Sequence, residues 1–197
     1  MSVCTGLIEP SVAAEFPALR LRWTILGALV RASPRELERR LAALSDRYRG
    51  ADVVAMRTKP IPHAYRSFFR QVGLDPDASR IPSEEAAVRR LLHGRFRSSD
   101  TLEDARLIAL VETGVPVWAL DAQVVDENSL GIRITGGRLV VADSVRVHAT
   151  LFDEPDPGHV PSRGTCRIVL FAIGVEGVPA IHLEEALWMA RDVIGPG

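Results

Sequence analysis

One short segment of this sequence carries the residue types of a catalytic triad, namely Asp143, Ser144 and His148. In a triad the histidine takes the proton of the serine hydroxyl, and the aspartate orients the imidazole ring. The segment has the pattern of extended chain, in which successive side chains alternate between two faces. Residues 143 and 148 then fall on opposite faces, so we predict that no triad forms.

The other residues with chemical potential are dispersed. The histidines occur singly, and a lone histidine is more often a surface or capping residue than a ligand; they are His63, His93, His148, His159 and His182. No glycine-rich phosphate loop, His-x-x-x-His or Gly-x-Ser-x-Gly motif occurs. Cys4 and Cys166 lie far apart, and neither belongs to a Cys-x-x-Cys motif. We expect no metal site and no cofactor.

Composition and length predict an ordinary soluble globular protein. Of the 197 residues, 47% are hydrophobic and 25% are charged. The length suits a single domain over residues 1–197. No apolar run approaches the roughly 18 residues of a membrane helix, and the N-terminus lacks the basic and apolar regions of a secretion signal. We therefore predict a cytoplasmic protein that does not bind membranes.

The charges are distributed unevenly along the chain. Residues 1–97 hold 17 Lys and Arg against 10 Asp and Glu, whereas residues 98–197 hold 7 against 15, which gives net charges of +7 and −8. This asymmetry points to an anionic partner for the first half. Solvated helix faces are the alternative, because 23 of the 24 cations are arginine.

Caps and apolar stripes predict helices in the first half and at the end of the chain. Residues 34–48 follow a capping box at Ser33-Pro34-Arg35-Glu36. Leu41 lies on the apolar stripe of this helix, and Leu91 on that of a later one, so both should be buried. The further helices are expected over 62–72, from a Ser83 cap to Gly94, from Asp100 or Thr101 to Gly114, and around Leu183 and Leu187.

Strands are expected mainly after Gly114. Alternating or apolar runs bounded by Gly, Asp and Pro mark them, and Gly136-Gly137 is a two-residue hairpin signal. The expected strands are 19–24, 115–120, 130–135, 138–142, 145–151 and 166–173. Helices first and strands later predict an α+β fold.

Four motifs follow one another in fixed order between Tyr65 and Asp121. They are Gly73-Leu74-Asp75-Pro76, the Pro82-Ser83 helix start, the Leu102-Glu103-Asp104 helix start and the segment from Gly114 to Asp121. This order resembles the B3/4 domain, the aminoacyl-editing and tRNA-binding module of the phenylalanyl-tRNA synthetase β subunit, which also occurs as free-standing proteins. The resemblance is strongest over residues 60–178. It implies an antiparallel, partly barrel-like sheet covered by helices.

The resemblance also implies an altered editing pocket. The family pattern reads Asp-x-x-Asn and later Gly-x-Pro-x-His-x-x-Asp, and four of its positions are matched without a gap by Asp104, Gly114, Pro116 and Asp121. Leu107 then stands where the family has Asn, and Trp118 where it has His. Counting from Thr165, Phe171 stands at the position of the pocket Glu. Either the cleft has filled with core side chains, or it is a pocket suited to a more apolar ligand.

Arginines interleaved with aromatic residues are the candidates for binding RNA, because phosphate attraction and base stacking make a sequence-tolerant grip. Tyr65, Phe68 and Phe69 supply the aromatic rings, although Phe68 and Phe69 also fit the buried face of their helix. The candidate cations are Arg66, Arg70, Arg89, Arg90 and Arg95.

Three functions follow from these features. The leading hypothesis is a binding module for an aminoacyl-tRNA end or an amino-acid-like ligand, with a degenerate editing pocket. The second is a trans-editing hydrolase of mischarged aminoacyl-tRNA, in which Asp104, Asp121 or His148 replaces the missing groups. The third is a non-catalytic scaffold for a protein partner. An open pocket beside Trp118 would favour the first two, and no feature of the sequence predicts an oligomeric state.

Overall fold

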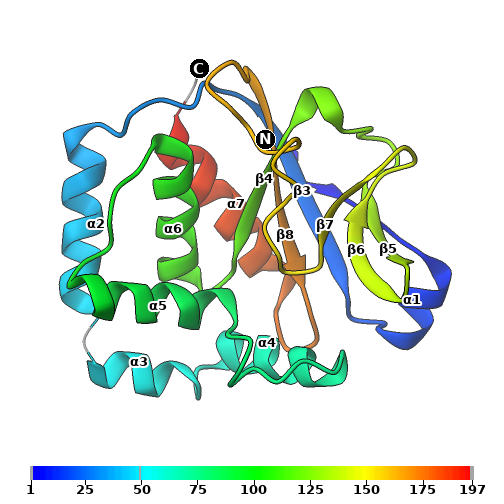
Figure 1. The fold of residues 1–197 in the computed structure, drawn as a ribbon, viewed down its shortest axis with the longest axis horizontal. Helices are drawn as coiled ribbons and strands as arrows, with labels where there is room; N and C mark the ends of the chain where they lie inside the picture. Colours follow the sequence, from blue (N-terminus) through cyan, green and yellow to red (C-terminus); the bar gives the residue numbers. More distant parts are fainter. Residues whose placement is uncertain (1, 49, 196–197) are drawn as a thin grey trace.

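The computed structural model describes residues 2–48 and 50–195 and has the α+β class that the sequence predicts (Figure 1). Its α-helices are α1 (Pro10–Glu15), α2 (Arg35–Arg47), α3 (Gly50–Met56), α4 (Pro60–Gln71), α5 (Pro82–His93), α6 (Thr101–Thr113) and α7 (Ala180–Ile194). Its strands are β1 (Cys4–Thr5), β2 (Leu7–Ile8), β3 (Arg20–Gly27), β4 (Val117–Asp121), β5 (Gly131–Thr135), β6 (Arg138–Ala142), β7 (Val147–Thr150) and β8 (Arg167–Gly174).

The strands divide into two four-stranded sheets. Sheet A has the order β1-β3-β8-β4 and is antiparallel throughout. Sheet B has the order β2-β5-β6-β7, and its β2–β5 pair is parallel. The strands therefore form no closed barrel, and the finer expectation of a B3/4 arrangement stays a prediction. Figure 1 shows α2, α6 and α7 on one side of sheet A, with β5, β6 and β7 on the other.

The two faces of sheet A are covered differently. A Cβ at Gly174 would lie 2.6 Å from Leu183 Cδ1, so α7 packs directly on the β8 backbone on this face. Because side chains alternate along a strand, Phe171 points to the opposite face. There it lies between its two cross-strand partners, Trp23 on β3 and Trp118 on β4. This aromatic row belongs to the main core, which also contains buried residues of sheet B.

A second, smaller core holds α2 against α6. It contains Leu37, Leu41 and Leu44 of α2, Ile108 of α6 and Phe96 of the loop between α5 and α6. Leu41 is 1% exposed, which confirms its predicted burial. The apolar stripe of α2 was therefore interpreted correctly from its spacing.

Two of the predicted helix caps are wrong, and one is confirmed. The α2 N-cap is Pro34, which makes no side-chain cap hydrogen bond, and the buried Ser33 hydroxyl has no hydrogen-bond partner among the described residues. Ser83 lies inside α5, because this helix begins at Pro82. Asp100 caps α6 as expected, since its carboxylate accepts hydrogen bonds from the backbone N–H groups of residues 102 and 103.

The predicted burial of Leu91 is also wrong. Its exposed fraction is 42%, and that of Leu92 is 75%. The buried residues of α5 are Ser83, Glu84 and Ala87, all in its first half. Glu84 is held inside by a buried ion pair with Arg66 of α4. The ion pair with α4 therefore holds the first half of α5, while its last turn meets solvent.

The turn at Gly136-Gly137 is confirmed as a hairpin between β5 and β6. Both glycines have positive φ angles, 58° and 75°, as a two-residue turn of this kind requires. The register pairs Thr135 with Arg138. Strand bounds in this region agree with the sequence expectation to within about two residues, whereas α1, α3, β1 and β2 were not expected.

Truncating Leu41 to alanine should lower the free energy of unfolding by about 2–5 kcal/mol, because transfer and cavity costs both apply at a closed site. Leu92→Ala is the matched control, and its 75% exposure predicts a change within about 0.5 kcal/mol. Urea unfolding followed by circular dichroism measures both. Equal effects of the two substitutions would contradict the assignment of the small core.

Candidate functional site

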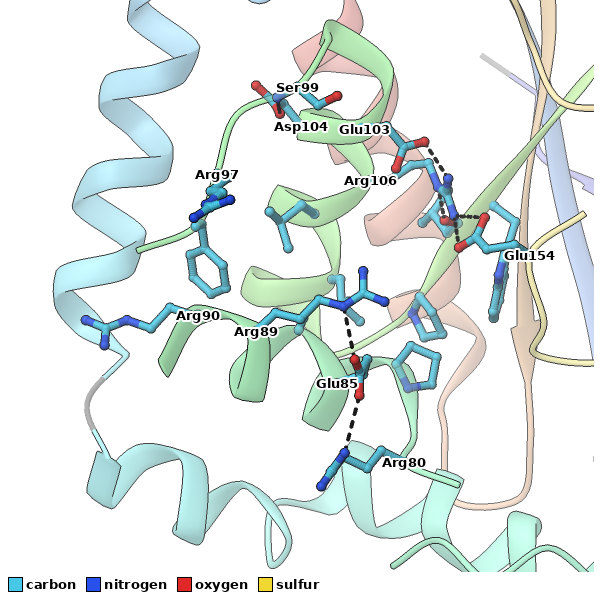
Figure 2. Close-up of a pocket in the computed structure, with 18 of the residues that line it drawn as sticks. Arg80, Glu85, Arg89, Arg90, Arg97, Ser99, Glu103, Asp104, Arg106 and Glu154 are labelled. Carbon is cyan, nitrogen blue, oxygen red and sulfur yellow. Dashed lines mark hydrogen bonds and ion pairs between the residues drawn. The ribbon is translucent and has the colours of Figure 1, made fainter. Parts of the chain in front are cut away.

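A cavity of about 660 Å³ lies between α5, the 94–99 loop, α6, the beginning of β4 and the 152–154 turn (Figure 2). Two of the three residues predicted to line a ligand pocket, Leu107 and Trp118, border it. Leu107 lies on α6 and Trp118 on β4, so each residue is in the helix or strand that the sequence predicted for it. The cleft beside Trp118 is therefore not completely filled, because this cavity lies there.

Trp118 forms part of the floor of the cavity, and almost all of its side chain is buried. It is 2% exposed, and its ring stacks on Phe171 with centroids 5.6 Å apart and planes 18° apart. Phe171 itself is 1% exposed and is absent from the cavity lining. Phe171 therefore does not border this cavity, because it lies beside Trp118 on the neighbouring strand and packs against its ring.

Phe152 completes the floor, and sequence reasoning missed it. Its backbone adopts φ 69°, a left-handed conformation that is uncommon for a residue other than glycine. Its ring contacts Trp118 at a centroid distance of 6.0 Å and also packs against Tyr65, Phe68 and Phe69 of α4. The aromatic residues of α4 thus support the floor from inside, and Phe68 and Phe69 are buried. No local sequence signal indicates this arrangement.

Arginines occupy one wall of the cavity. Glu85 forms ion pairs with both Arg80 and Arg89. In Figure 2 the Arg89 side chain extends across the cavity toward its centre. Arg95 and Arg97 are exposed, and within the described residues neither forms an ion pair. This wall includes three of the predicted RNA-binding residues, namely Arg89, Arg90 and Arg95.

Arg90 lines the same wall but has a structural role. Its Nε and Nη2 atoms donate hydrogen bonds to the backbone carbonyl of Ser45, at 3.1 and 2.7 Å. Ser45 lies in the last turn of α2, where unpaired carbonyls and the helix dipole favour a cation. The Arg90 side chain therefore ties α5 to α2, and its charge is partly used in this contact.

Acidic side chains occupy the opposite wall. Arg106 of α6 joins Glu103 and Glu154 at 2.6 and 2.7 Å, and its Nε donates to the backbone carbonyl of Val117. Burial alone would lower the pKa of Arg106, but the two carboxylates raise it. This group of ion pairs fixes the 152–154 turn against α6 and the beginning of β4 (Figure 2).

Arg66 is corrected as an RNA-binding candidate. It is 5% exposed, and its guanidinium lies 2.8 Å from Glu84 and 2.7 Å from Asp77. A cation that is buried and paired in this way does not offer its charge to a phosphate. Arg70 is exposed on α4 and does not border the cavity.

The candidate catalytic aspartates serve as hydrogen-bond acceptors for the backbone and for hydroxyl groups. Asp104 borders the cavity but is 1% exposed, and it accepts hydrogen bonds from the Ser98 hydroxyl and the Ser99 N–H. Asp121 accepts from the Thr165 hydroxyl and the Gln123 N–H and does not border the cavity. Both carboxylates are therefore engaged in positioning loops.

His148 contacts Asp143, contrary to the expectation that they lie on opposite faces. His148 Nε2 is 2.8 Å from Asp143 Oδ2, and both side chains are fully buried. The reason is a tight turn: the Asp143 N–H donates to the Arg146 carbonyl, so the chain reverses between the two residues. Ser144 points elsewhere, because its hydroxyl donates to Asp126. The predicted absence of a triad holds for this different reason.

The Asp143 carboxylate is strongly stabilised in its charged form. Burial alone would raise its pKa, but hydrogen bonds from the N–H groups of Asp126, Val145 and Arg146 and from His148 lower it to about 2. The pKa of His148 is lowered, mainly by burial, and the charges of His159 and Arg146 act in the same direction. The Asp143 charge opposes this shift only in part.

Outside this cavity, the described residues offer fewer candidates for a functional site. No group of three or more His, Cys, Asp or Glu residues among those described is placed to hold a metal ion. No described helix is long and apolar enough to cross a membrane. A second hollow of about 1130 Å³ runs along α7, where Trp188 is 56% exposed, but it contains none of the residues that the sequence singled out.

Comparison with known proteins identified no relative of this chain. No protein-family model matches the chain, and no curated protein matches it. The geometry of the cavity therefore carries the functional argument, together with the motif order between Tyr65 and Asp121.

The free energy of unfolding should fall as the pH drops below about 6.5. The unfolded chain binds a proton at His148 with a pKa near 6.5, whereas the folded chain resists it, so stability is lost as the pH falls toward the lowered folded value. The slope from this one group is at most about 1.4 kcal/mol per pH unit. His148→Gln should flatten the profile below pH 6.5, as measured by urea unfolding. His63→Gln, which removes an exposed ring on α4, is the control. Equal slopes in the two variants would contradict this role.

Proposed function

We propose that this chain is a binding module for an aminoacyl-tRNA end or an amino-acid-like ligand, with a degenerate editing pocket. The observation that carries the proposal is the cavity of about 660 Å³ beside Leu107 and Trp118. These are the positions that the B3/4 resemblance marks as a ligand pocket. The space beside these two residues supports the pocket alternative, while Trp118 and Phe171 themselves belong to the main core.

The size and lining of the cavity suit a small ligand. Small-molecule sites occupy about 300–1,000 Å³ and combine an apolar surface with a few polar groups. Here Leu107, Trp118, Pro116 and Phe152 supply the apolar surface, and the α5 arginines supply positive charge. Positive charge at the entrance attracts the phosphates of an RNA end.

Binding is favoured over hydrolysis by the side chains around the cavity. Ester hydrolysis needs a group that accepts a proton from water and donors for the developing oxyanion. Asp104 already accepts two hydrogen bonds, and Leu107 and Trp118 replace polar residues of the family pattern. A scaffold function, the third hypothesis, gives no reason for a cavity with this lining.

Filling the cavity should weaken ligand binding. Cytidylyl-cytidylyl-puromycin is a stable mimic of an aminoacylated tRNA end, and its affinity can be measured by calorimetry. Leu107→Trp should weaken that affinity at least about tenfold, because the larger ring occupies space that the ligand needs. Leu92→Trp adds the same ring at an exposed site of α5 outside the lining and should change nothing. Failure of the unmodified protein to bind the mimic would contradict the proposal.

The unmodified protein should show no deacylation of tyrosine attached to phenylalanine tRNA above the buffer rate. Loss of one preorganised polar partner costs a hydrolytic site about a hundredfold, and two such positions are apolar here. Release of labelled tyrosine over time measures the rate. Leu107→Asn with Trp118→His restores the residue types of the family and tests whether activity can be recovered. Robust hydrolysis by the unmodified protein would instead support the trans-editing hydrolase.

A further inference from the structure

The charges that line the cavity are separated into two walls. The wall formed by α5 and its flanking loops carries five arginines and one acid, which are Arg80, Arg89, Arg90, Arg95, Arg97 and Glu85. The wall formed by α6 and the 153–154 turn carries four acids and one arginine, which are Glu103, Asp104, Asp153, Glu154 and Arg106. Figure 2 shows the ion pairs of Glu85 and those of Arg106 in separate parts of the cavity.

Each wall keeps an excess of its own charge after internal pairing. On the α5 wall, Glu85 is shared by Arg80 and Arg89, so one carboxylate serves two cations. Arg97 adds a further cation that forms no ion pair within the described residues. On the other wall, Arg106 is shared by Glu103 and Glu154, so one cation serves two carboxylates. The cavity therefore has a positive side and a negative side.

We propose that the ligand is dipolar, with an anionic group against the α5 wall, an ammonium group against the Glu103–Glu154 wall and an apolar side chain toward Leu107 and Trp118. This assignment rests on the proposed function and makes it more specific. A nucleotide that is aminoacylated on its 2′ or 3′ hydroxyl has these three parts, because its amino acid keeps a free ammonium group and its 5′ phosphate lies on the far side of the ribose.

The size of the cavity distinguishes this class from a free amino acid. In a free amino acid one carbon atom separates the carboxylate from the ammonium group, whereas the cavity carries its opposite charges on different elements, α5 and α6. The cavity volume of about 660 Å³ lies within the range of sites for drug-sized ligands. An aminoacyl nucleotide is larger than a free amino acid and holds its opposite charges farther apart.

The test pairs changes in ligand charge with changes in protein charge. Three probes are compared by calorimetry: cytidylyl-cytidylyl-puromycin, its N-acetyl form without the ammonium charge, and puromycin, which lacks phosphates. Arg97→Glu probes the positive wall, and Glu154→Gln probes the negative wall. Arg163→Glu, at an exposed loop arginine outside the lining, is the control for the first. Glu127→Gln, at another carboxylate that is ion-paired with an arginine, is the control for the second.

The expected pattern is a specific coupling. Arg97→Glu should weaken the phosphate-bearing mimic about tenfold and leave puromycin nearly unchanged, because only the former presents an anion. Glu154→Gln should weaken both ammonium-bearing probes and leave the N-acetyl form unchanged. Both controls should bind all three probes as the unmodified protein does.

Two contrary outcomes have different meanings. If the phosphate-bearing mimic binds but its affinity is indifferent to Arg97→Glu and Glu154→Gln, the dipolar assignment is overturned while the binding module stands. If none of the probes binds to the unmodified protein, the proposed function itself is contradicted, and the dipolar assignment with it.

Discussion

The ion pair between Arg66 and Glu84 determines where α5 lies, and α5 is one wall of the cavity. The side chains of both residues are 6% exposed, and Asp77 adds a second carboxylate 2.7 Å from the Arg66 guanidinium. A buried charge is costly unless it is paired, so α4, the loop at Asp77 and α5 can pack only in an arrangement that keeps these groups together. Arg57 contacts both carboxylates from the outside, at 3.1 and 3.5 Å. The arginines of the cavity wall are therefore presented by a helix whose position is fixed electrostatically.

The floor of the cavity depends on aromatic packing within sheet A. Trp118 stacks on Phe171, and Phe152 joins this pair to the aromatic residues of α4. Stacked and edge-on rings contribute beyond the area they bury, which makes the floor rigid. The walls, in contrast, are made largely of long charged side chains. A rigid apolar floor with charged walls separates the recognition of shape from the recognition of charge.

Local sequence patterns predicted most helices and strands well, but they predicted poorly which other residues these helices and strands contact. The alternating strands around Gly136-Gly137 and the Leu37–Leu41–Leu44 stripe emerged from spacing alone, because each depends on its own residues. Ser33 and Ser83 were assigned as caps from type and position, yet α2 and α5 begin at other residues. The face of α5 depends on Arg66, and the contact of Asp143 with His148 depends on a turn between them. For the candidate site, counting from Asp104 brought Leu107 and Trp118 to one cavity, whereas Phe152 is defined only by rings distant in sequence.

The Asp143 carboxylate also has a consequence for motion. It accepts hydrogen bonds from backbone groups at 126, 145 and 146 and from the His148 ring, so it joins the chain before β5, the turn between β6 and β7, and β7 itself. If one donor is released, the other donors still hold their segments at the buried carboxylate. Partial opening therefore loses a hydrogen bond but frees little of the chain, so the gain in chain entropy is small. These segments should therefore exchange their amide hydrogens as a single cooperative unit, with the carboxylate as its common anchor.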